Sequence, residues 1–290
     1  MSLNKSYLIA LFLLAWVVAL ILVPITFDEL SGYFSFAFLG LIGAIFANST
    51  GAGGGVVFIP MFNQLGFTPE QAVATSFGIQ SFGMTAGALT WFFHRSRHCI
   101  AEPDWSPFAT IIVLTAVFSV VGIWLVYGFG QAIPGSLNIV FSGFSVLLGL
   151  AILATVYVSG KPTLHSQLKS YDLVALGLIG LLGGVITAWL SVGVGELLAT
   201  YLILRRFNII MAIATAVIVS AITVWFSMPQ HLYLQPNVYW QVVIFAGPAA
   251  VLGGIFARTL VTWLSPRKLK LFFAFWVLIM GLSGMIEVVI

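Results

Sequence analysis

Long apolar stretches recur along almost the whole chain, and they constrain the fold more than any other feature of the sequence. They lie at about residues 7–25, 70–93, 107–128, 134–158, 208–227, 238–263 and 268–288. Each is close to the roughly 20 residues that a helix needs to cross a hydrocarbon core about 30 Å thick. Only 7% of the residues are charged, and the gaps between the apolar stretches are short. No segment is therefore left over for a soluble domain. We therefore expect an all-α polytopic membrane protein.

Basic residues are distributed unevenly between the gaps that separate these stretches. Ten of the 11 fall in gaps that should share one side, namely Lys5, Arg95, Arg97, Lys161, Lys169, Arg205, Arg206, Arg267, Lys268 and Lys270. Lys and Arg are enriched in cytoplasmic loops. We therefore predict a multi-pass inner-membrane protein with a cytoplasmic N-terminus and an outer C-terminus. Orientation in the lipid bilayer explains the basic residues, and with them the net charge of +3. No nucleic-acid partner is therefore expected.

Two further apolar segments, 34–65 and 172–204, are each interrupted by a glycine cluster. The basic residues fix which loops lie on which side of the membrane. Given those sides, segment 34–65 must begin and end outside, and segment 172–204 must begin and end inside. An arm such as 34–48 would reach only about 22 Å as a helix, which is too short to cross the hydrocarbon core. Each segment is therefore predicted to be a helical hairpin that dips into the membrane. Non-helical backbone at that depth must be buried in protein or line a wet cavity.

The two halves of the sequence resemble each other at a shift of 140 residues. The shift places Gly40, Gly43, Gly53, Gly55, Phe67, Ala72, Ala74 and Thr75 on Gly180, Gly183, Gly193, Gly195, Phe207, Ala212, Ala214 and Thr215. We predict an N-terminal transmembrane helix at 1–32, a first repeat at 33–158, a cytoplasmic linker at 159–171 and a second repeat at 172–290. Each repeat is a broken-helix hairpin followed by three spans.

The predicted sides make the two repeats inverted, because the first hairpin enters from outside and the second from inside. Inverted repeats with broken helices near the midplane are typical of secondary transporters. An inverted duplication that only builds a stable bundle, as in some channels, is the alternative. The repeat therefore favours transport of a small solute.

The glycine-rich turn of the first hairpin offers donors for an anion. A half-helix that begins near Gly54 presents unpaired amide N–H groups and the positive end of its dipole. Close helix packing through small residues is the alternative explanation of the glycines. The candidate substrate-binding residues here are Asn48, Ser49, Thr50, Gly51, Gly53, Gly54 and Gly55.

The second turn contains Ser191, Gly193, Gly195 and Glu196, which is the only acid predicted deep in the membrane. Such an acid usually faces a cavity, a partner or a proton path. We predict that Glu196 couples protons to anion binding, the alternative being a static ion pair with Arg258 or with Arg205 and Arg206. Four polar residues on the first full span of each repeat could complete the site: Thr75, Ser76, Gln80 and Thr215. The alternative for their hydroxyl groups is a bond to their own helix.

The first hairpin, with Gly51, Gly53, Gly54, Gly55 and Pro60 followed by Thr75, resembles the sulfite exporter TauE/SafE family of TSUP transporters. The resemblance covers about residues 34–288 and extends to Gly193, Gly195 and Thr215 in the second copy. It implies export of sulfite, sulfonates such as sulfoacetate, or related carboxylates and phosphonates. The second copy departs from the family pattern, with Glu196 in place of Val56 and Thr200 in place of Pro60.

Three other functions compete with a proton-coupled anion exporter. An intramembrane enzyme would need paired acids, a Ser with a His or Lys partner, or His ligands at membrane depth, and none is visible in the sequence. We expect no catalytic residues, no metal and no cofactor. An anion channel of the same architecture and a carrier for a zwitterion such as taurine stay open. The oligomeric state is not encoded in these patterns.

Overall fold

The computed structural model describes residues 16–18, 27–99, 102–130, 137–157 and 167–289. Within these ranges the regular structure is helical and contains no strands. The first half comprises α2 (Phe27–Thr50), α3 (Gly55–Gln64), α4 (Pro69–His98), α5 (Phe108–Gly128) and α6 (Leu137–Tyr157), with a 3₁₀ turn at Pro103–Trp105. The second comprises α7 (Ser170–Leu190), α8 (Val194–Leu204), α9 (Ile209–Pro229), α10 (Trp240–Trp263) and α11 (Pro266–Val289), with a π-helical turn at Gln230–Leu234. Most of the predicted helix at 7–25 lies outside the described residues.

Several of these helices suit a membrane by length and composition. Among the described residues, five stretches are long and apolar enough to cross one: Gly32–Thr50, Pro103–Gly128, Ser170–Leu190, Ile209–Leu234 and Trp240–Trp263. Large apolar side chains such as Val113, Leu147, Val174 and Leu252 are more than half exposed on the outside of the bundle. Exposed apolar surface of this kind suits contact with lipid.

The predicted spans agree with the helices to within a few residues, but the first arm of the first hairpin does not. α2 begins at Phe27, seven residues before the predicted start at 34. Its 24 residues correspond to about 36 Å of helix, so the prediction of a short arm was wrong.

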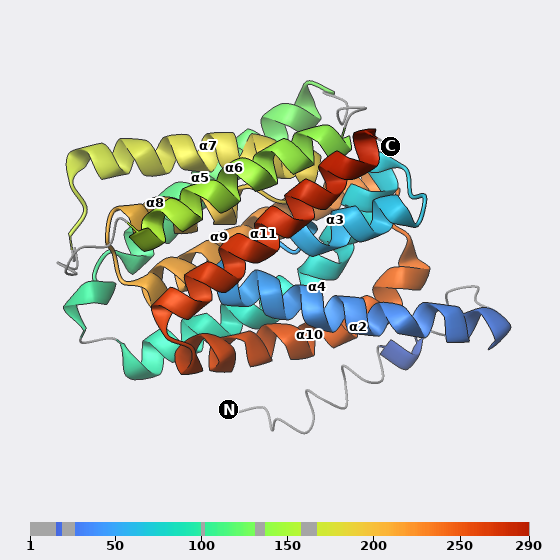
Figure 1. Ribbon diagram of the computed structural model, residues 1–290, viewed down its shortest axis with the longest axis horizontal. Coiled ribbons are helices and arrows are strands. Elements are labelled where there is room, and N and C mark those ends of the chain that lie inside the picture. The colour runs from blue at the N-terminus through green and yellow to red at the C-terminus, as the bar shows by residue number, and fades with distance from the viewer. Residues whose placement is uncertain (1–15, 19–26, 100–101, 131–136, 158–166, 290) are drawn as a thin grey trace.

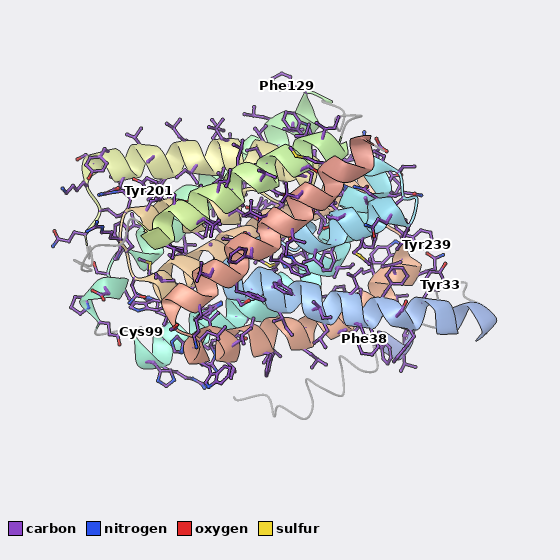
Figure 2. All side chains as sticks on the ribbon, in the orientation of Figure 1. Tyr33, Phe38, Cys99, Phe129, Tyr201 and Tyr239 are labelled. Atoms are coloured by element: carbon purple, nitrogen blue, oxygen red, sulfur yellow. The ribbon has the colours of Figure 1, made fainter. Side chains whose placement is uncertain are left out.

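Both glycine clusters interrupt a helix and reverse the chain. The first hairpin consists of α2 and α3, and the second of α7 and α8. Figure 1 shows the first hairpin entering the bundle from the right and the second from the left. Figure 2 places Tyr33 and Tyr239 at the right end, and Tyr201 and Cys99 at the left. The inversion of the two repeats, their domain boundaries and the sides of the membrane stay predictions from the sequence.

Each hairpin packs on a helix from the other half of the chain. α2 lies along α10, and α7 lies along α5. The repeated glycines make these crossings close: a Cβ atom on Gly40 would overlap the carbonyl oxygen of Ala246, and one on Gly180 would approach that of Thr115. Close backbone approach through small residues is a common basis of helix association in membranes. The two halves are therefore interlocked, with their turns facing each other in the middle.

Replacing Gly40 by Ala tests this crossing. The added Cβ meets the backbone of Ala246, which no side-chain rotation relieves, so Gly40→Ala should destabilise the fold by about 1–3 kcal/mol. Gly32→Ala is the matched control in the same helix, because nothing lies within 4 Å of its new Cβ atom. The melting temperatures of the two purified variants in detergent check this. Equal melting temperatures would contradict the packing described here.

Candidate functional site

The two hairpins meet through their non-helical turns, turn 1 (residues 51–54) and turn 2 (residues 191–193). Gly51 and Gly193 have φ angles of 82° and 152°, which glycine adopts at little cost. Gly55 packs directly against the carbonyl group of Ser191, so that any larger residue there would collide with turn 2. The glycines therefore serve both to reverse the chain and to bring the two turns into contact.

Glu196 joins the two turns with one carboxylate. It is the third residue of α8, and its side chain has no solvent exposure. Oε1 accepts a hydrogen bond from the amide of Gly53 at 2.6 Å, and Oε2 accepts one from the amide of Gly193 at 2.7 Å. Both oxygens therefore accept from main-chain N–H groups, one in each turn.

Gln80, in the middle of α4, joins the same two turns with an amide. Its Oε1 accepts from the amide of Gly54 at 2.8 Å. Its Nε2 donates to the Oγ of Ser191 at 2.8 Å, to the carbonyl oxygen of Ser191 at 3.1 Å and to the Oγ of Ser76 at 3.0 Å. The Ser191 hydroxyl also donates to that of Ser76, at 2.9 Å. These three side chains form one buried network beside Glu196.

Side chains of the protein itself take up the main-chain donors of both turns. The amides of Gly53 and Gly193 bind Glu196, that of Gly54 binds Gln80, and that of Val194 donates to Thr187 Oγ1 at 3.0 Å. The turn amides therefore lie close together in space, and their role as anion ligands stays a prediction from the sequence. In this conformation they hold a carboxylate, an amide oxygen and a hydroxyl group.

Other predicted residues satisfy their own helices. The hydroxyl groups of Ser49, Thr50 and Thr215 donate to carbonyl oxygens one turn back, at 2.5 Å to Ile45, 2.7 Å to Phe46 and 3.0 Å to Met211. Thr75 accepts from the amide of Tyr239 at 3.0 Å, which ties α4 to the loop before α10. The structure thus brings Ser76, Gln80, Ser191 and Glu196 together at the turns. Thr50 also binds turn 1, since its Oγ1 accepts from the amide of Ala52 at 3.2 Å. The hydroxyl groups of Ser49, Thr75 and Thr215 have other partners.

Asn48 lies beside turn 1 with an incomplete set of hydrogen bonds. Its Nδ2 donates to the carbonyl oxygens of Ala44 at 2.8 Å and Gly83 at 3.3 Å, whereas its Oδ1 is buried without a donor. Asn48, Gly54 and Gln80 line a narrow void that leaves no room for a water molecule. The remaining lining is apolar, from Ala44, Ala47, Phe58, Ile79, Gly83, Met84 and Ala250. The side of turn 1 is therefore closed in this conformation.

No basic side chain neutralises Glu196 in the part of the chain that the structure describes. Arg205 pairs with the buried Asp172 at 2.7 Å, and Tyr201 donates to the same carboxylate at 2.5 Å. The Nη1 atom of Arg258 lies 3.3 Å from His94 Nδ1. The hydrogen bonds of the Glu196 carboxylate come from main-chain amides, and no charged side chain among the described residues interacts with it. Glu196 therefore does not form the static ion pair with Arg258 or Arg205 that was the alternative prediction.

Sequence inspection missed one residue of the site, Thr187, and the capping role of another, Glu196. Thr187, in the last turn of α7, accepts the amide of Val194, but its counterpart at the 140-residue shift is Ala47 and drew no attention. The local role of Glu196 was also readable, since a Glu three residues after a helix N-cap commonly binds the N-cap amide. Among the described residues, no group of three or more His, Cys, Asp or Glu side chains is placed to hold a metal ion.

Comparison with known proteins gives one match. The sulfite exporter TauE/SafE family matches residues 36–284, which is nearly the whole chain. No curated protein and no solved structure matches it. The match covers both hairpins, both turns and the helices that carry Gln80 and Glu196. This multi-pass membrane protein therefore belongs to the sulfite exporter TauE/SafE family.

Proposed function

We propose that this protein is a secondary transporter that exports a small sulfur-containing or organic anion, such as sulfite or a sulfonate, across the inner membrane. Membership of a sulfite exporter family supports the class of solute. The observation that carries the proposal is the carboxylate of Glu196, which main-chain amides from both turns hold inside the bundle. Amides that bind one negative group in this way have the chemistry to bind another.

The path of the solute is proposed to pass between the two turns. Turn 1 ends the long arm of one hairpin, turn 2 ends that of the other, and the hairpins enter from opposite ends of the bundle (Figure 1). A rearrangement of one hairpin relative to the other would expose the turns to one side at a time. Inverted-repeat transporters use this alternation around a central site. The inverted relation predicted from the sequence fits such a cycle.

Proton coupling is proposed to reside in Glu196. An ionised carboxylate repels an incoming anion, whereas a protonated one carries no charge and can donate a hydrogen bond. Anion binding and protonation of Glu196 should therefore favour each other. No charged side chain interacts with Glu196 among the described residues, so its own charge dominates the electrostatics of the two turns.

Proteoliposomes loaded with methanesulfonate test this coupling. Methanesulfonate keeps its single charge between pH 6 and pH 8, so a pH effect on its transport reports on the protein. Efflux through the wild-type protein should respond to an imposed proton gradient, and efflux through Glu196→Gln should not. A parallel series with sulfite tests the solute suggested by the family. An undiminished response of Glu196→Gln to the gradient would exclude Glu196 as the coupling group.

Gln80→Leu tests the bridge between α4 and the two turns. The substitution leaves the amide of Gly54 without its acceptor and Ser191 without its donor, which should cost about 1–3 kcal/mol of stability. Transport should fall with it, because the turns lose their fixed spacing. Thr90→Ala is the matched control, since that hydroxyl only bonds the carbonyl oxygen of Ala86 within α4. Melting temperature and methanesulfonate efflux are measured on both variants. If Gln80→Leu matches Thr90→Ala in both measurements, Gln80 does not stabilise the contact between the turns.

A further inference from the structure

We propose that the carboxylate of Glu196 is a tethered substitute for the transported anion: it occupies the substrate position between the two turns and leaves that position when the substrate binds. The inference rests on the proposed function and deepens it. It defines the substrate class as anions with two oxygens on one central atom, which covers sulfite, sulfonates, carboxylates and phosphonates.

Local helix capping does not account for the position of Glu196. A Glu at the third position of a helix needs only the N-cap amide, which here is Gly193, to satisfy the helix N-terminus. The second oxygen instead binds Gly53, 143 residues away in the other hairpin. The bond to Gly53 is the shorter of the two, at 2.6 Å. One carboxylate therefore spans the contact between the hairpins, where an exchangeable anion would meet both turns.

The two amides define the shape of what they bind. They reach separate oxygens of a single carboxylate, at 2.6 and 2.7 Å, so the donors are spaced for a forked group. A sulfonate or sulfite presents the same fork from sulfur. An ammonium group offers only donors and cannot accept from either amide. The two amides thus select the acceptor end of a solute.

Two anions do not fit together at this place. The polar side chains that bind the turns are neutral: Ser76 and Gln80 from α4, Thr187 from α7, and Ser191 from turn 2. No cation among the described residues offsets a second negative charge at Glu196. Like charges a few ångströms apart in a buried site repel strongly, and protonation of the carboxylate relieves the repulsion. Substrate binding therefore requires a neutral Glu196 that has released both amides.

A released Glu196 has hydrogen-bond partners nearby. Ser220 Oγ and Thr200 Oγ1 are buried and have no hydrogen-bond partner among the described residues. Ser220 lies against Gly195, the residue before Glu196, and Thr200 lies one turn further along α8. Residues four apart share a helix face, so the Thr200 hydroxyl belongs to the same side of α8 as Glu196. Two unused hydroxyl groups therefore flank Glu196, where a protonated carboxyl group can bond to them.

Removing the tethered carboxylate should open the site to free anions. The purified full-length protein is titrated with methanesulfonate at pH 6 and pH 8, with wild type, Glu196→Ala and Glu196→Gln compared. Wild type should bind more tightly at pH 6. Both variants should bind at least about tenfold more tightly than wild type at pH 8, because no internal carboxylate competes for the two amides, and their affinity should not change with pH. Val56→Ala truncates the residue at the equivalent position of the first hairpin and should behave like wild type.

Formate provides a second measurement on the same proteins. It is a carboxylate small enough for the space left by Glu196→Ala, so it should raise the melting temperature of that variant at pH 8 and leave wild type unchanged. Variants that bind methanesulfonate no better than wild type, with no response to formate, would overturn the tethered-anion proposal alone. Failure of wild type and all variants to bind either methanesulfonate or sulfite would overturn the proposed function as well. Glu196→Gln preserves the side-chain volume and keeps the titration decisive if the Ala variant does not fold.

Discussion

The contact between the two turns depends on one buried carboxylate and the main-chain amides that it binds. Glu196 takes one donor from each turn, and Gln80 adds a second bridge through neutral groups. Without these acceptors the broken helices would leave amides unpaired inside an apolar bundle, at a cost of several kcal/mol per group in lipid. The interruption of both helices exposes the amides, and the polar network between the helices binds them. Neither is stable without the other.

The amino-acid sequence predicts much of this arrangement because membranes restrict the possible structures. The hydropathy pattern, the basic loops and the glycine clusters placed the spans and both helix breaks within a few residues. The start of α2 was missed because residues 27–32 mix polar and apolar types, so hydropathy does not mark them as part of a span. Prediction was therefore best where burial of apolar surface alone decides the outcome.

The site was predicted less completely, since its hydrogen bonds link residues far apart in the chain. The 140-residue repeat drew attention to Gly193, whose amide binds Glu196, and also to Thr215, which bonds its own helix. Glu196 itself drew attention as the one acid predicted deep in the membrane. Whether a hydroxyl group faces the helix backbone or a neighbouring turn depends on its rotamer, which a sequence pattern does not contain. The bond from Gly53 to Glu196 crosses between the repeats. Comparing one copy with the other could not reveal it.

The ion pair between Asp172 and Arg205 makes the two hairpins mechanically unequal. It joins the start of α7 to the end of α8, and Tyr201, which Figure 2 labels, donates to the same carboxylate. At the 140-residue shift the first hairpin has Gly32, Met61 and Leu65, none of which carries a charge. Separating α7 from α8 therefore breaks a partly buried ionic contact, whereas separating α2 from α3 breaks none. The first hairpin therefore needs less electrostatic work to separate its arms than the second.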